Sequence, residues 1–219
     1  MTRLHRPLSA FLAALVLAGC QKAAPPPNQT PAGTTAAPAG PVAPDSFRVA
    51  FETGKGRFVV QVNRAWAPRG ADRFHELVQS GYYDRVKFFR VLPNFIAQFG
   101  IQGDPATNKQ WERPIADDPV KESNKKGTLT YAMGGPNTRT TQLFVNTRDN
   151  GRLDGMGFAP FGRVVEGIEV VEKLYNGYGE GPPEGRGPDQ GRIESDGNAY
   201  LNRSFPRLDS IITARIIKN

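Results

Sequence analysis

Apolar residues recur at strand-like and helix-like intervals from Phe47 onward. Two runs rich in aromatic and β-branched residues, 47–53 (FRVAFET) and 57–62 (RFVVQV), stand on either side of a Gly-Lys-Gly turn. Such a pattern predicts a β-hairpin. The next run, 68–79 (PRGADRFHELVQ), repeats its apolar residues at helical spacing until Gly81, so we expect a helix to follow the hairpin.

Further short apolar runs bounded by Gly, Pro or Asn predict more strands. These runs are 86–92, 95–101, 128–133, 142–147 and 210–217. Residues 165–175 (VEGIEVVEKLY) have a second helical face instead. Many strands and two helices predict a mainly β fold, with a mostly antiparallel sheet closed into a barrel so that no strand edge is exposed.

Residues 176–205 (NGYGEGPPEGRGPDQGRIESDGNAYLNRSF) carry glycine or proline at many positions. The segment is too long for a plain connection between two elements. It is therefore either a functional surface loop or an ordered excursion packed on the domain, and the sequence does not choose between the two.

Residues 1–19 have the layout of an export signal, with Arg3 and Arg6 before an apolar stretch. The stretch is shorter than the ~20 residues of a permanent membrane-spanning helix. The following Leu-Ala-Gly-Cys run, which ends at Cys20, resembles the lipobox of bacterial lipoproteins, in which the cysteine becomes the lipid-bearing first residue. Cys20 is the single cysteine of the chain, so an internal disulfide is excluded and we expect Cys20 to carry lipid.

The composition divides the remaining chain into two parts. Residues 20–46 are rich in Pro, Ala, Thr and Gly without a periodic apolar face, so we expect a flexible tether. Residues 47–219 are long enough for one domain with its own core. Removal of Arg3 and Arg6 leaves 26 basic and 21 acidic residues, interleaved along the chain. We therefore expect a solvated basic surface and no nucleic-acid binding.

Several classes of catalytic site lack the residues they need. After processing, His75 is the only histidine, and it lies on or beside the apolar face of the predicted first helix, which favours a structural role. This shortage disfavours histidine-dependent nucleophilic sites and zinc sites. Residues 149–155 resemble a calcium loop but lack its glutamate at the twelfth position, so we expect a turn. The spaced glycines of 177–181 do not follow a strand, and nucleotide binding has little support.

The polar residues of two strand-like runs are more informative. Because side chains alternate along a strand, Phe88, Arg90 and Leu92 should share one face, and Ile96 and Gln98 should share a face of the next strand. Burial of an arginine and a glutamine as plain core residues is unfavourable unless both find polar partners.

The run 142–147 shows the same alternation. If Leu143 and Val145 fill the barrel, Gln142 and Phe144 point outward. One arginine, two glutamines and several aromatic residues would then share an outer surface.

Five motifs in order resemble the cyclophilin family of peptidyl-prolyl cis-trans isomerases. They are 89–98 (FRVLPNFIAQ), 132–138 (AMGGPNT), 142–145 (QLFV), 153–155 (LDG) and 161–164 (FGRV). The resemblance covers nearly all of 47–219 except the glycine-rich excursion. It implies an eight-stranded antiparallel β-barrel capped by two α-helices, with a groove for prolyl peptides on the outside.

The resemblance also implies roles for single residues, which do not require a cofactor or metal. Arg90 and Gln98 are the catalytic pair. The remaining positions implied to bind substrate are Phe95, Ile96, Phe144 and Leu153 around the proline ring, Gln142 on the peptide backbone, and Ala132 and Met133 on the neighbouring wall.

The sequence departs from the family pattern at two places. Arg152 stands where many cyclophilins have tryptophan, which weakens the expectation of tight cyclosporin binding. Phe158 is expected in the region where a histidine is frequent, which makes the substrate pocket more apolar.

Together these features predict a lipid-anchored prolyl isomerase of a bacterial envelope, on the outer membrane facing the periplasm because Gln21, not aspartate, follows Cys20. We expect a monomer that acts on proline-containing proteins while they fold. Two alternatives stay open: a non-catalytic chaperone or scaffold that binds proline peptides, and an assembly subunit that uses the 176–205 surface.

Overall fold

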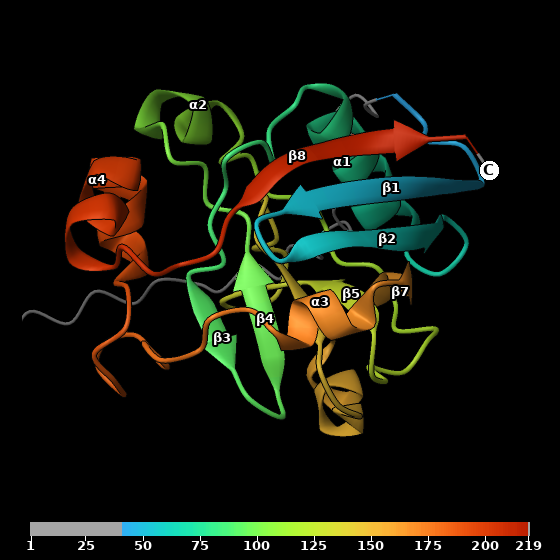
Figure 1. The fold of residues 1–219 in the computed structure, drawn as a ribbon. Helices are drawn as coiled ribbons and strands as arrows, with labels where there is room; N and C mark the ends of the chain where they lie inside the picture. Colours follow the sequence, from blue (N-terminus) through green and yellow to red (C-terminus); the bar gives the residue numbers. More distant parts are fainter. Residues whose placement is uncertain (1–40, 219) are drawn as a thin grey trace, which may run out of the picture. The chain divides into compact units, whose positions relative to one another are not determined.

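The computed structural model describes residues 41–218 (Figure 1). The predicted signal peptide, the lipidation site Cys20 and most of the predicted tether lie outside these residues. Within the described part, eight antiparallel strands and several short helices form a mainly β fold, as predicted.

The expected hairpin and first helix are confirmed. Strand β1 (Ser46–Thr53) pairs along its whole length with β2 (Gly56–Asn63). Helix α1 (Pro68–Gln79) has the predicted bounds, begins with a proline and buries its apolar face. The Phe74 ring of this face packs between Phe51 of β1 and Phe161, with ring centroids 6.3 and 5.2 Å away. Helix α1 therefore covers the core side of the sheet.

The remaining strands extend this hairpin into one curved sheet. They are β3 (Arg90–Leu92), β4 (Ile96–Phe99), β5 (Thr128–Tyr131), β6 (Leu143–Asn146), β7 (Pro160–Glu166) and β8 (Ile211–Ile217). The order across the sheet is β3-β4-β6-β5-β7-β2-β1-β8. Strands β3 and β4 consequently run across the direction of β1, β2 and β8 (Figure 1).

The closed barrel that we expected is not what the strand order forms. Strands β3 and β8 stand at the two ends of the sheet, which curls into a half-barrel. A single bridge between Lys87 and Ser210 and neighbouring backbone hydrogen bonds, such as Ile211 N to Val86 O at 2.8 Å, join the two ends. The cause is the short β3, whose regular pairing with β4 begins only at Arg90.

The irregular backbone before β3 also corrects one predicted face. Phe88 was expected beside Arg90, but it lies in the main core with its ring 5.1 Å from that of Phe99. Phe89 packs in a different apolar cluster. Alternation therefore holds only within the paired residues of β3.

The helices differ from the two that we expected. The second predicted helix, 165–175, is wrong at both ends: β7 continues to Glu166, Gly167 turns the backbone at a φ of 78°, and α3 covers only Ile168–Glu172. The described residues also include α2 (Pro105–Gln110), a 3₁₀ helix η1 (Gly151–Met156) and α4 (Gln190–Ser204).

The glycine-rich segment 176–205 is an ordered excursion in this structure. Helix α4 lies at its end, next to α2 (Figure 1). It builds a second apolar cluster with the chain around β3 and β4, which contains Phe89, Ile101, Ile193, Tyr200, Leu201, Phe205 and Leu208. The segment is thereby packed onto the sheet on the side of β3.

Candidate active site

Three neighbouring strands place polar and aromatic side chains in one row. Arg90 of β3 is directly opposite Gln98 of β4, and Gln98 is directly opposite Phe144 of β6. Residues directly opposite on adjacent strands project to the same face of a sheet. The row is therefore a consequence of strand register.

Strand β6 separates this face from the core as the alternation predicted. Leu143 and Val145 lie in the main core, whereas Phe144 belongs to a separate cluster with Ile96 and Leu153. This smaller cluster forms the apolar floor of a surface pocket of about 610 Å³.

All ten residues expected to bind substrate or catalyse line this one pocket. They are Arg90, Phe95, Ile96, Gln98, Ala132, Met133, Gln142, Phe144, Leu153 and Phe158. The lining residues without an assigned role are Gly134, Thr138, Thr140, Arg152, Met156 and Gln190. The sequence signalled Arg152 only as a departure from the family pattern, and nothing in it pointed to Gln190.

A chain of hydrogen bonds crosses the polar side of the pocket. Arg90 Nη1 donates to Gln98 Oε1 at 3.0 Å, and Gln98 Nε2 donates to Gln142 Oε1 at 3.0 Å. Gln98 is buried, and these two bonds give its amide oxygen and its amide nitrogen one protein partner each in place of water. Arg90 and Gln98, which are unsuited to a plain core, are therefore oriented by hydrogen bonds to each other and to Gln142.

Glu180 joins this network from the glycine-rich segment. Its two carboxylate oxygens accept hydrogen bonds from Arg90 Nε and Nη2, both at 2.6 Å. These bonds hold the pKa of the Glu180 carboxyl below its ordinary value, while partial burial works in the opposite direction. No local pattern in the sequence marks Glu180, because its partner Arg90 lies 90 positions away.

Two cations flank the Phe95 ring at the edge of the pocket. The guanidinium carbon of Arg90 lies 5.8 Å from the ring centroid, and that of Arg152 lies 4.9 Å from it. Both distances are within the range of cation–π attraction. Phe158 packs edge-on against Phe144 with centroids 5.8 Å apart, which adds an aromatic ring to the pocket lining.

The Leu-Asp-Gly turn is held by Asp154. Its carboxylate accepts from Ser123 Oγ at 2.6 Å and from the backbone N and side-chain Nδ2 of Asn124 at 2.8 Å each. Burial raises the pKa of the Asp154 carboxyl, but these hydrogen bonds outweigh it and the pKa is lowered. The contacts fix η1, whose one buried residue is Leu153 of the pocket floor. Where we expected a turn at 149–155, the structure has the 3₁₀ helix η1 from Gly151 onward.

One prediction concerns a residue outside the pocket, His75, and two further findings concern metal ligands and membrane spans. His75 packs edge-on against Phe47 with centroids 4.9 Å apart, in keeping with a structural role. Between residues 41 and 218, no three His, Cys, Asp or Glu side chains are grouped as metal ligands would be. No helix in the same range is long and apolar enough to cross a membrane.

The chain resembles known proteins over most of the described residues. The family described as "Cyclophilin type peptidyl-prolyl cis-trans isomerase/CLD" matches residues 48–194. A "Peptidyl-prolyl cis-trans isomerase-like 1" from Aspergillus oryzae is 36% identical over 132 residues, which are 58% of this chain and 80% of that protein. A peptidyl-prolyl cis-trans isomerase from Streptomyces antibioticus is 35% identical over 139 residues, covering 58% of this chain and 81% of its own.

A solved structure has the same fold. The crystal structure of a Cryptosporidium parvum cyclophilin type peptidyl-prolyl cis-trans isomerase, in the presence of the dipeptide Ala-Pro, matches with a TM-score of 0.56. The match covers 78% of this chain and 99% of that chain at 20% identity, so it speaks for the fold alone. The family match spans more than half of the chain, and the relatives similar in sequence carry the name of the same enzyme class. The chain therefore belongs to the cyclophilin-type peptidyl-prolyl cis-trans isomerase family, and the enzyme class expected from its motifs is confirmed.

Proposed function

We propose that the enzyme accelerates rotation about X-Pro bonds in proteins that fold in a bacterial cell envelope, through Arg90 and an apolar proline pocket. The observation that carries this proposal is the position of the Arg90 guanidinium, which borders an apolar floor and is hydrogen-bonded to Gln98. Such a site offers a fixed hydrogen-bond donor next to a binding surface for a proline ring.

The reaction explains why an arginine suits this place. Rotation about a peptide bond breaks amide resonance at a barrier of ~18–20 kcal/mol. In the twisted transition state the prolyl nitrogen becomes pyramidal and regains a lone pair that the planar amide lacks. The Arg90 guanidinium donates a hydrogen bond to that lone pair, so it stabilises the transition state more than the ground state.

The pocket residues hold the two sides of the rotating bond. Phe95, Phe144 and Leu153 hold the pyrrolidine ring on an apolar surface, and Gln98 binds the carbonyl side. Ile96 and Phe158 complete the apolar floor and wall, Gln142 binds the peptide backbone, and Ala132 and Met133 border the neighbouring groove. Excluded water and preorganised donors strengthen the polar contacts at the prolyl nitrogen.

The proposed location rests on residues 1–46. Of these, only 41–46 belong to the described structure. The export signal and lipobox-like run support a lipid-anchored protein with Cys20 as the acceptor, on the outer membrane facing the periplasm. The substrates are proline-containing proteins in the course of folding, and the enzyme acts on them as a monomer.

The test is the cis-to-trans relaxation of an X-Pro peptide in the presence of the purified protein. Acceleration in proportion to enzyme concentration is the expected result. A folded protein that binds the peptide but leaves its relaxation rate unchanged would replace this proposal with the non-catalytic, peptide-binding alternative.

A further inference from the structure

Glu180 and Arg90 form a two-point ion pair beside the pocket. The two hydrogen bonds are 2.6 Å each, and the side chains are 31% and 21% exposed. Parallel charge-assisted bonds between a guanidinium and a carboxylate fix the relative orientation of both groups. The plane of the Arg90 guanidinium is therefore restrained by a residue far away in sequence.

Glu180 reaches Arg90 from outside the substrate pocket. Arg90 and Gln190 line both this pocket and an adjoining cavity of about 510 Å³, whereas Glu180 lines the adjoining cavity and not the substrate pocket. An arginine has five N–H groups. Glu180 takes one on Nε and one on Nη2, and Gln98 takes one on Nη1, so one N–H on each terminal nitrogen is left for a substrate.

Close backbone packing holds the segment around Glu180 in place. Gly187 N donates to Glu180 O at 2.7 Å, and Gly181 N donates to the Glu180 carboxylate at 3.1 Å. A Cβ at Gly187 would lie 2.8 Å from Glu180 O, so only glycine fits without a shift. The Tyr178 ring packs edge-on against Phe205 with centroids 5.0 Å apart, which ties the segment to the residue that ends α4.

We propose that Glu180 is a positioning residue of the isomerase reaction. It holds the Arg90 guanidinium in the orientation in which the remaining N–H groups meet the prolyl nitrogen. A preset orientation removes a reorganisation step from the approach to the transition state. This inference rests on the proposed role of Arg90, and it gives the glycine-rich segment a function in the same site.

The test compares two charge-neutralising substitutions in the full-length protein, with an uncharged X-Pro peptide as substrate. Glu180→Gln removes the carboxylate from Arg90, and kcat should fall about tenfold while KM stays unchanged. Glu184→Gln is the matched control, because Glu184 is exposed in the same segment and no hydrogen bond or ion pair of its side chain occurs among residues 41–218. Its kinetics should equal those of the wild type.

Glu180→Asp is the second variant. It keeps a carboxylate, so recovery of the greater part of the lost kcat supports positioning through the ion pair. An unchanged or increased kcat for Glu180→Gln, or an equal loss for Glu184→Gln, overturns the inference.

A nuclear magnetic resonance measurement separates this inference from the proposed function. The Arg90 Nε–H signal, assigned by its loss in Arg90→Lys, should exchange slowly with solvent in the wild type and rapidly in Glu180→Gln. Rapid exchange in the wild type overturns the ion pair whatever the activity. A protected signal in a protein that does not accelerate X-Pro relaxation contradicts the proposed function instead.

Discussion

Because side chains alternate along β6, two adjacent apolar residues lie on opposite faces of the sheet, one in the core and one under the pocket. Leu143 packs in the main core, and Phe144 packs with Ile96 and Leu153 under the pocket. The sequence was sufficient to predict this division because β6 is a regular paired strand. It was not sufficient for Phe88, since the backbone before Arg90 is not paired as a strand.

Phe144→Ala tests the binding face. Loss of the ring removes apolar contact with the substrate proline, and KM should rise about tenfold, in line with the value of burying one large apolar side chain. Leu143→Ala is the control: it should lower the free energy of unfolding by about 2–5 kcal/mol and leave KM unchanged. Steady-state kinetics and urea unfolding measure both effects. An equal rise in KM for the two variants would show that the faces are not separate.

The helices and strands differ in how strongly the local sequence pattern predicts them. The first hairpin and α1 have long, uninterrupted patterns, and their predicted bounds agree with the structure to within one residue. Helix α4 was missed because it contains few apolar residues and a glycine, Gly197, whose backbone is not helical. Its stability comes from contact with distant residues such as Phe89 and Ile101, which no local pattern records.

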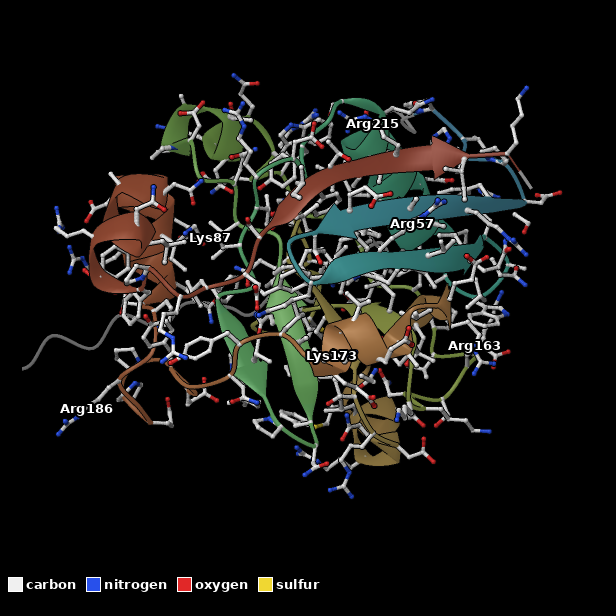
Figure 2. The ribbon with its side chains drawn as sticks, viewed as in Figure 1. Arg57, Lys87, Arg163, Lys173, Arg186 and Arg215 are labelled. Atoms are coloured by element: carbon white, nitrogen blue, oxygen red, sulfur yellow. The ribbon has the colours of Figure 1, made fainter. Side chains whose placement is uncertain are left out.

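Gly187→Ala tests whether the segment before α4 is shaped to present Glu180. The added Cβ forces the backbone around Glu180 to move, because it would approach three carbonyl oxygens at 2.8 to 3.0 Å. We expect a fall in kcat about as large as that of Glu180→Gln. Arg186→Ala is the matched control, since the exposed Arg186 side chain projects away from the ribbon (Figure 2). A Gly187→Ala enzyme with wild-type kcat would mean that the tight packing does not serve the site.

In the molecule as a whole, the pocket residues could be predicted from the sequence, but the ion pair that holds Arg90 could not. Nine of the ten pocket residues, all except Phe158, occur in motifs whose order identified the family, and strand register brings Arg90, Gln98 and Phe144 together. The Arg90–Glu180 pair could be recognised only from the path of the chain between α3 and α4, which passes beside β3 (Figure 1). Contacts between segments this far apart are set by tertiary packing, and a single sequence carries no signal for them.

The proposed place of the enzyme in the cell depends on Cys20. Metabolic labelling with a radioactive fatty acid should mark the wild-type protein and not Cys20→Ala, because a lipobox cysteine is the site of lipid attachment. Labelling of both proteins to the same extent would remove Cys20 as the lipid acceptor. Such a result would leave the isomerase site itself unaffected.

The most direct measurement of the central claim is the catalysed cis–trans exchange of an X-Pro peptide by the wild type and by Arg90→Ala at matched folding. If Arg90 stabilises the twisted amide, the variant keeps its fold and loses about 100-fold in kcat/KM, as enzymes do when a preorganised transition-state donor is removed. Equal activity of the two folded proteins would contradict the account.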